Sequence, residues 1–404
     1  MLRKSILKIS IVSGGNVFNA VLGFTFLTAV AKNLAVEDFG KYALMTSLLV
    51  FLSKLMDLGT NSIFVAESIA DTRKLKDTLF SLKIMQFIVA VPITLVLLKV
   101  FNLLDQNITW LFIVGLLAYG INLLLFAYFQ RVEMFIHLVL INTIPAAIKG
   151  LFAVLVFVGI FNLTLTSAFA IFALSMLSCT VMYVLVPKEL KQPRFVTTET
   201  LSLLSKSISG GAAQGIGFGW SAIGNGLAKL FKTFTDVGIY SLADKIANIF
   251  TLVALGIFTV LLPKQAKQKR SNNEYNWRET LLLGMGVLIL AIFAMFSAEF
   301  FVEIVFGSKF AESKKLLDIL IIASAITAIH TFMESYYFIE KNTMPLLIIT
   351  LVKLFALIAG SYLLIPLYEL PGLAVAQLIA ALGALLISGS YIYFKTEQAK
   401  KHLI

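Results

Sequence analysis

Four lysines lie inside long apolar stretches of the sequence: Lys54, Lys149, Lys245 and Lys353. A charged side chain at the centre of a bilayer costs about 2.5–3.5 kcal/mol on insertion scales, so such residues face a bundle interior or a wet cavity. Lysine ammonium groups bind phosphate oxygens as point charges, and a low dielectric strengthens the attraction. We therefore expect these lysines to line a cationic cavity for an anionic substrate. The alternatives are an ion pair between helices and snorkelling towards the membrane surface.

The neighbours of these lysines differ. Asp57 follows Lys54 at the spacing of an ion pair within one helix, whereas Asp244 directly precedes Lys245, and adjacent side chains point apart on a helix. No acidic residue stands within a turn of Lys149. A fifth candidate for the cavity is Arg131 at the end of an apolar stretch, where it is equally suited to anchor the topology.

A histidine and a carboxylate form a second kind of candidate site. His330 and Glu334 are four residues apart, so they share one face of a helix. Such a pair within a membrane can relay protons and so couple transport to a proton gradient. The alternative is a structural hydrogen bond. We take ion coupling as the hypothesis for this pair.

Composition decides which elements must position these groups. Hydrophobic residues make up 59% of the 404 residues and charged residues 14%, against about 45–50% and about 25% in globular chains. This composition predicts an integral membrane protein. One cysteine excludes an intrachain disulfide, and three scattered histidines show no metal-ligand spacing, so we expect no metal and no cofactor. There is also no GxxxxGK[ST] motif for ATP, and we expect the protein not to be an enzyme.

The apolar stretches predict an all-α, polytopic membrane protein with twelve transmembrane helices. Each stretch is long enough to cross a hydrocarbon core of about 30 Å. The expected spans are 9–31, 41–64, 81–101, 109–130, 138–160, 164–186, 204–228, 236–262, 280–302, 316–339, 343–366 and 371–394. Most of the 33 basic residues fall in the alternate loops that share a side with the N-terminus, which favours both termini in the cytoplasm. The net charge of +11 therefore reflects orientation, and we expect no nucleic-acid partner.

The chain contains an internal repeat. Asp38–Leu44 and Asp236–Leu242 both read D-x-G-x-Y-x-L, and each follows a span that carries Ser-Gly-Gly. Six spans per half give both halves the same orientation, so we expect two six-helix lobes related by a pseudo-two-fold axis along the membrane normal. The expected boundaries are 1–190 for the first lobe, 191–202 for a cytoplasmic loop and 203–404 for the second lobe.

The repeat makes the fifth and eleventh spans equivalent, and each carries a lysine near its middle. Lys149 and Lys353 would then line one cavity from opposite sides. The Ser-Gly-Gly sites suggest helix flexibility near a binding region. The alternative is close helix packing by small residues. The glycines concerned are Gly14, Gly15, Gly210 and Gly211.

Several short motifs resemble those of a known family. They are Leu34–Tyr42 with its L-x-x-x-D-F-G-x-Y pattern, Asp57-Leu58-Gly59, Gly238–Ser241, Val305–Phe310 and Leu316–Leu320. Together they resemble the polysaccharide-biosynthesis flippases, the O-antigen or Wzx-type members of the multidrug/oligosaccharidyl-lipid/polysaccharide exporter superfamily. The similarity runs over most of the chain.

The resemblance implies a flippase that moves an undecaprenyl-diphosphate-linked oligosaccharide across the bacterial cytoplasmic (inner) membrane by alternating access, for O-antigen (lipopolysaccharide) or another surface polysaccharide. The implied partners are that lipid-linked oligosaccharide, membrane lipids, a polysaccharide polymerase and a chain-length regulator. The alternative within the superfamily is a cation-coupled multidrug or metabolite exporter, which the absence of a carboxylate from the first span disfavours. A third hypothesis is a non-transporting membrane scaffold for polysaccharide assembly, which the cationic cavity disfavours.

Overall fold

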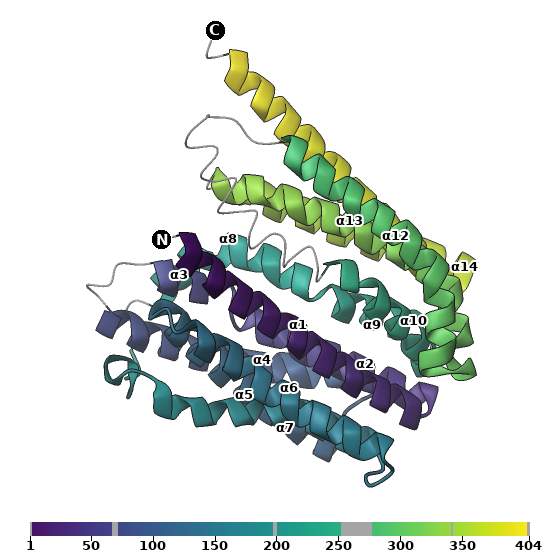
Figure 1. Ribbon diagram of the computed structural model, residues 1–404, viewed down its shortest axis with the longest axis horizontal. Coiled ribbons are helices and arrows are strands. Elements are labelled where there is room, and N and C mark those ends of the chain that lie inside the picture. The colour runs from purple at the N-terminus through teal and green to yellow at the C-terminus, as the bar shows by residue number, and fades with distance from the viewer. Residues whose placement is uncertain (1, 67–71, 197–199, 252–276, 341, 402–404) are drawn as a thin grey trace. The chain divides into compact units, whose positions relative to one another are not determined.

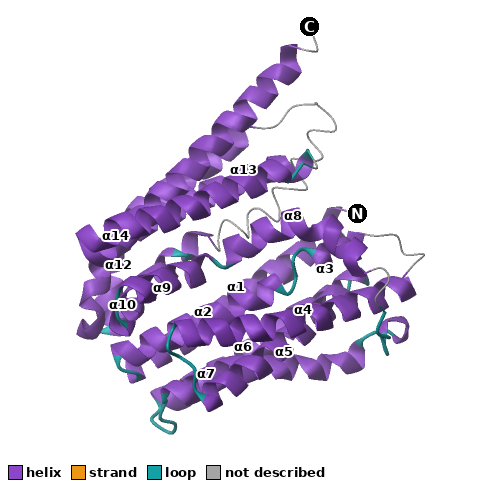
Figure 2. Ribbon diagram, turned by 180° about the vertical axis from the view of Figure 1, so that it is seen from behind, coloured by secondary structure: helices purple, strands orange, loops and turns teal. Residues whose placement is uncertain are grey.

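The computed structural model describes residues 2–66, 72–196, 200–251, 277–340 and 342–401. Within these ranges every regular element is a helix, so the predicted all-α fold is confirmed (Figure 2). The chain divides into two compact units, Met1–Ala222 and Ile223–Ile404. The expected lobe boundaries at 190 and 203 stay a prediction.

The first unit consists of helices α1 to α8 together with two 3-10 segments. Their bounds are α1 Leu2–Asn33, α2 Val36–Leu55, α3 Thr60–Ala66, α4 Thr72–Val100, α5 Gln106–Arg131, α6 Phe135–Phe157, α7 Leu165–Ser175, η2 Met176–Leu185, η3 Lys188–Leu190 and α8 Thr200–Phe218. Helix α1 packs along α6, and α5 packs against α7 and η2 (Figure 1). Helix α8 packs against α2, α3 and α4.

The second unit consists of the later helices. Their bounds are α9 Trp220–Phe231, which begins at the boundary, α10 Phe234–Ala247, α12 Trp277–Phe306, η4 Ser308–Ser313, α13 Lys314–Ile339 and α14 Met344–Lys401. Helix α13 packs against α10, α12 and α14 (Figure 1). The eleventh and twelfth expected spans both lie in α14, which consists of two helices that meet at a break in helical geometry at Glu369 (φ 56°, ψ −139°), between Pro366 and Pro371.

Eight helices in the described residues are long and apolar enough to cross a membrane. They correspond to the expected spans except the second, seventh and eighth, and one of them covers both the eleventh and the twelfth. The eighth expected span lies partly outside the described residues. Exposed large apolar side chains, such as Phe293, Phe296 and Phe300 on α12, follow one helical face and suit contact with lipid. The protein is therefore a multi-pass membrane protein, while the number twelve stays a prediction.

The second expected span, 41–64, is wrong as a continuous helix. Helix α2 ends at Leu55 and α3 begins at Thr60. Between them Leu58 and Gly59 have φ angles of 42° and 75°, a left-handed conformation that glycine adopts at little cost. The carboxylate of Asp57 then accepts a hydrogen bond from the backbone N–H of Asn61 at 3.2 Å, which caps the start of α3.

The repeated motif occupies the same structural position in both units. Each copy lies at the beginning of a helix, Asp38 in α2 and Asp236 in α10. The motif tyrosines are almost fully buried in both, Tyr42 at 2% exposed and Tyr240 at 1%. The repeated sequence motif therefore has the same secondary structure and the same buried tyrosine in both units.

The segment that follows η3 is hydrogen-bonded to α4. Lys76 donates to the carbonyl of Lys191 at 2.8 Å, Asp77 accepts from the backbone N–H of Arg194 at 2.8 Å, and Ser81 accepts from the backbone N–H of Val196 at 2.7 Å. Three side chains of α4, spread over six residues, therefore bind the chain just before α8.

Candidate functional site

The second unit contains a buried polar network between α13 and α14. His330 is only 4% exposed, and its Nδ1 lies 3.3 Å from the Oε1 of Glu334 one turn further along α13. The Nε2 of His330 lies 2.9 Å from the Oγ of Ser388 on α14. The hydroxyl of Tyr337 donates to the same Ser388 oxygen at 3.2 Å. Four polar side chains therefore form one connected chain inside an apolar bundle.

The direction of these hydrogen bonds follows from their chemistry. An ionised carboxylate only accepts, so the Nδ1 of His330 carries the hydrogen that points to Glu334. In a neutral imidazole Nε2 then accepts from the Ser388 hydroxyl, which itself accepts from Tyr337. Protonation of His330 makes Nε2 a donor, so the Ser388 hydroxyl must turn away.

Lys353 lies beside this network. The lysine, on α14, is 9% exposed, and its Nζ donates to the Thr327 hydroxyl of α13 at 3.4 Å. The carboxylate of Glu334 lies within electrostatic range of the ammonium. The structure therefore brings together two groups that the sequence assigns to different roles, the cavity lysine and the coupling pair.

Lys149 has a different environment in the first unit. It lies on α6 with its Nζ 5.0 Å from the centre of the Phe172 ring on α7. Phe172 in turn packs edge-to-face against the repeat tyrosine Tyr42, with ring centroids 6.2 Å apart. Within the described ranges no ion pair joins Lys149 to a carboxylate. A cation held by an aromatic face keeps its N–H donors available for an anion.

Lys54 lies at the end of α2, and its Nζ is 4.8 Å from the centre of the Phe218 ring on α8. Its expected ion pair with Asp57 is wrong, because Asp57 pairs with Lys83 of α4 at 3.1 Å. Lys54 and Asp57 nevertheless line one small polar cavity of about 30 Å³, together with Gly59, Gly211, Gln214, Gly215 and Phe218. This cavity is large enough for a water molecule.

Arg131 and Lys245 lie apart from these groups. The guanidinium of Arg131 is hydrogen-bonded to the carbonyl of Phe64 and lies 4.7 Å from the centre of that ring, so it holds the end of α3. Lys245 is half-buried on α10 next to Asp244, whose carboxylate accepts from Asn248 at 2.9 Å. The roles of both residues in substrate binding stay predictions.

The predicted flexible glycines lie within unbroken helices. Gly14 and Gly15 are inside α1, and Gly210 and Gly211 are inside α8. A β-carbon on Gly15 would collide with Val139 of α6, and one on Gly211 would collide with the backbone of Leu58. Close packing therefore requires glycine at Gly15 and Gly211. No neighbour lies within 4 Å of the position of a β-carbon on Gly14. A role in helix flexibility stays a prediction.

Lys83 is the functional candidate that the sequence did not single out. Lys83 is 5% exposed and pairs with Asp57. The signal that could have found it is the acidic residue in the middle of the second apolar stretch, which needs a partner. In the part of the chain that the structure describes, no group of three or more histidine, cysteine, aspartate or glutamate residues is placed to hold a metal.

Long apolar helices define a multi-pass membrane protein. Comparisons with solved structures agree on the fold. An inward-closed lipid II flippase, MurJ, matches with a TM-score of 0.71 at 15% identity, covering 95% of this chain and 87% of that one. An inward-facing multidrug transporter of the MATE family of the MOP superfamily matches with a TM-score of 0.72 at 12% identity, covering 95% and 96%.

The sequence comparison identifies the family. Residues 6–269 match the polysaccharide biosynthesis protein family, and the chain belongs to that family. The resemblance found in the motifs is thereby confirmed. The capsular polysaccharide biosynthesis protein CapF of Staphylococcus aureus is 29% identical over 173 residues. That match covers 42% of this chain and 43% of CapF, so less than half of the relative's length is spanned.

Proposed function

We propose that this protein is a flippase that moves an undecaprenyl-diphosphate-linked oligosaccharide across the cytoplasmic membrane by alternating access. The observation that carries the proposal is Lys149, a cation inside an apolar helix that faces an aromatic ring. A diphosphate group supplies the anionic oxygens that such an ammonium lacks. Membership of the polysaccharide biosynthesis protein family supports a sugar-bearing substrate, and the fold shared with a lipid II flippase supports a lipid-linked one.

The substrate class follows from the same considerations. We infer a repeat unit of a surface polysaccharide, either O-antigen or capsule, and the name of the relative CapF supports capsule as much as O-antigen. The protein moves this lipid without changing it chemically, so it is a transporter rather than an enzyme. A polymerase and a chain-length regulator would act on the product outside the membrane, and both termini would lie in the cytoplasm of a bacterial inner membrane.

The test is analysis of lipid-linked sugars in a deletion strain. We expect the strain to accumulate lipid-linked oligosaccharide and to lose surface polysaccharide, and the wild-type gene to restore both. Lys149→Ala should fail to restore export although the protein inserts normally, whereas Lys149→Arg, which keeps the positive charge, should restore a part. Normal surface polysaccharide in the deletion strain would refute the proposed function.

A cation-coupled exporter of drugs or metabolites is the second candidate. The hydrogen-bond chain from Tyr337 through Ser388 to His330 is compatible with it, because a protonatable histidine can couple transport to a proton gradient. The same network would serve a proton-coupled flippase equally well. The two candidates differ in the deletion strain. Increased drug susceptibility with unchanged lipid-linked sugar would favour the exporter, and the opposite result would favour the flippase.

A further inference from the structure

The break between α2 and α3 places helix-end backbone groups inside the first unit, where Asp57 and Gly59 line the small polar cavity. The side chains of Met56 and Phe64 are 2% and 0% exposed. The last carbonyls of a helix have no partner within that helix, and in an apolar medium each must find one elsewhere. Within the break, the carbonyl of Lys54 accepts from the backbone N–H groups of Asp57 and Leu58. The carbonyl of Met56 and the side-chain oxygens of Asp57 and Thr60 take donors from another element.

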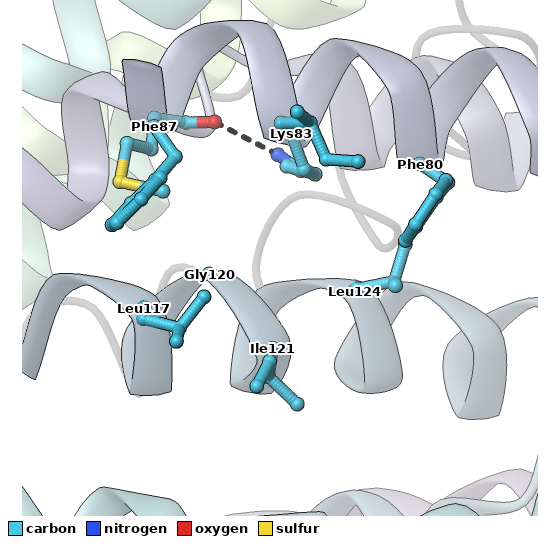
Figure 3. Close-up of a pocket in the computed structure, with 9 residues that line it drawn as sticks. Phe80, Lys83, Phe87, Leu117, Gly120, Ile121 and Leu124 are labelled. Atoms are coloured by element: carbon cyan, nitrogen blue, oxygen red, sulfur yellow. Dashed lines mark hydrogen bonds between the residues drawn. The ribbon is translucent and has the colours of Figure 1, made fainter. Parts of the chain in front are cut away.

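Lys83 of α4 supplies them. Its Nζ lies 3.0 Å from the carbonyl oxygen of Met56, 3.1 Å from the Oδ1 of Asp57 and 3.0 Å from the hydroxyl oxygen of Thr60. An ammonium group has three hydrogens and no acceptor, so these three oxygens match its donors one for one. Figure 3 shows the Lys83 side chain reaching from α4 to the carbonyl oxygen.

The three oxygens form a ligand set for a monovalent cation. A backbone carbonyl from the end of one helix segment, a carboxylate and a hydroxyl converge at one point on a broken helix. Broken membrane helices bind Na⁺ through unwound carbonyls and helix ends of this kind. The 3.0–3.1 Å separations fit N–H···O hydrogen bonds, so the ammonium of Lys83 takes the position of a bound ion.

We propose that the α2–α3 break is a monovalent-cation site that the Lys83 ammonium occupies as a tethered cation. Removing the lysine side chain then leaves a site that a free cation can fill. An alkylammonium is the best replacement because it brings the same donors and an apolar tail. The proposal goes beyond the transport function and does not rest on it.

The surroundings of Lys83 fit such a replacement. The alkyl part of the lysine lines an apolar cavity of about 100 Å³ between α4 and α5. Its walls include Phe80 and Phe87 of α4 and Leu117, Ile121 and Leu124 of α5 (Figure 3). Truncation of Lys83 to alanine enlarges this space by the removed propylammonium group, so n-propylammonium matches the missing atoms.

The site also holds α8 in place. A β-carbon on Gly211 of α8 would overlap the backbone of Leu58, and one on Gly59 would lie 3.2 Å from the Ser207 carbonyl. Helix α8 therefore packs directly on the bent backbone that Lys83 stabilises. Loss of the cation should loosen both the break and this contact.

The experiment measures the melting temperature of the full-length protein in nanodiscs. We expect Lys83→Ala to melt about 5–10 °C below the wild type, because its removal leaves the half-buried carboxylate of Asp57 without its ion pair at 3.1 Å. Addition of n-propylammonium should restore at least half of this loss in a saturable manner, and Na⁺ should restore a smaller part. Tetramethylammonium, which has no N–H donor, should restore nothing.

Two controls define the result. Lys99→Ala removes an exposed lysine from the same helix and should respond to no added cation. Lys83→Met fills the alkyl path without a charge, so it should lose stability and stay insensitive to n-propylammonium. The proposal is wrong if Lys83→Ala melts like the wild type, or if it melts lower and no cation restores it.

A second pair of variants, at Thr60, tests the proposal if Lys83→Ala does not accumulate in the membrane. Thr60→Ser keeps the hydroxyl oxygen that faces Lys83, and Thr60→Val removes it. The Thr60 hydroxyl also donates to the carbonyl of Asp57 at 2.6 Å, so the pair is compared with and without the ammonium. We expect Thr60→Val to melt about 2–5 °C lower than Thr60→Ser, and this difference to be smaller in the Lys83→Met background. Equal melting temperatures for the two variants would overturn the proposal.

Discussion

The lysines near the middle of long helices have different neighbours in the two units. Lys149 of the first unit lies against the aromatic ring of Phe172. Lys353 of the second unit donates to the hydroxyl of Thr327 and lies within electrostatic range of Glu334. The sequence repeat makes these positions equivalent, yet one lysine faces a π system and the other a carboxylate-containing network.

The two units therefore share their packing but differ in the polar neighbours of these lysines. The buried tyrosines Tyr42 and Tyr240 show that the repeat preserves packing, whereas the polar neighbours of the two lysines share nothing. A lysine that lies on an aromatic ring keeps most of its positive charge available to attract an anion. A lysine near a carboxylate has part of its charge compensated. Lys149 is thus suited to bind substrate and Lys353 to sense the state of His330 and Glu334.

The largest effect should come from the lysines themselves. We expect Lys149→Ala to lower export of lipid-linked oligosaccharide roughly 10- to 100-fold, because a charge-assisted hydrogen bond contributes about 1.5–3 kcal/mol. Lys353→Ala should lower it less, since Glu334 already offsets part of its charge. The measurement is surface polysaccharide in a complemented deletion strain, normalised to protein level. Equal losses in both variants would break the comparison between the units.

Glu334→Gln tests the network of the second unit. The substitution keeps the shape but removes the charge that faces His330 and Lys353, and we expect a loss of about 1–3 kcal/mol in unfolding free energy. In the Lys353→Met background the same substitution should cost less, because the partner charge is gone. Thermal unfolding of the four proteins of this cycle measures the coupling. Strict additivity would show that Glu334 and Lys353 do not interact.

Phe172→Leu tests the aromatic contact of the first unit. The cation–π interaction contributes about 0.5–2 kcal/mol, so this coupling should appear in a cycle with Lys149→Met. Leucine keeps an apolar side chain there, and the cycle removes the cost of the smaller volume. A matched control is Phe157→Leu, an exposed residue on α6. A zero coupling energy would mean that the ring only fills space.

The smallest effect should come from ion pairs at the ends of helices. Lys314 donates to the Glu303 carboxylate at 2.8 Å, and this hydrogen bond, followed by the charge of Lys314, lowers the pKa of Glu303. A lowered folded-state pKa stabilises the protein above the ordinary glutamate range and loses that contribution as the pH falls through the folded pKa. Glu303→Gln should lower the melting temperature at pH 7 by no more than about 2 °C.

The difference between Glu303→Gln and the wild type should vanish in acid. Glu37→Gln is the counterpart in the first unit, where Glu37 pairs with Lys41 at 2.8 Å within one helix. It should behave in the same way. A difference that persists at low pH would show that the carboxylate charge is not the cause.

The sequence predicted the helices well because apolar length is a local property. The spans around Lys149 and His330 coincide with α6 and α13, and the repeated motif marks equivalent helix starts. It also placed His330 and Glu334 correctly on one helical face, since four-residue spacing is sufficient for that. The nearness of Lys353 to this pair joins two helices, so no local pattern could predict it.

The bend at Asp57 was missed for a related reason. A run of apolar residues with one Gly is typical of a continuous span, and Gly59 became decisive only through its contact with α8. The sequence pairs Asp57 with the nearest lysine in the chain, Lys54. The actual partner Lys83 comes from another helix. Partners separated in sequence are chosen by packing, which spacing does not encode.

The bonds that α4 makes to the segment before α8 have a mechanical consequence. Three residues separate Val196, whose N–H is bound by Ser81, from Thr200 at the start of α8, so four peptide units join the two residues. A chain of that length reaches at most about 14 Å when fully extended. While the hydrogen bond from Val196 to Ser81 is present, the start of α8 therefore stays within this distance of the point where α4 binds the chain. A displacement of α8 beyond this reach therefore requires the hydrogen bonds between α4 and the segment 191–196 to break first.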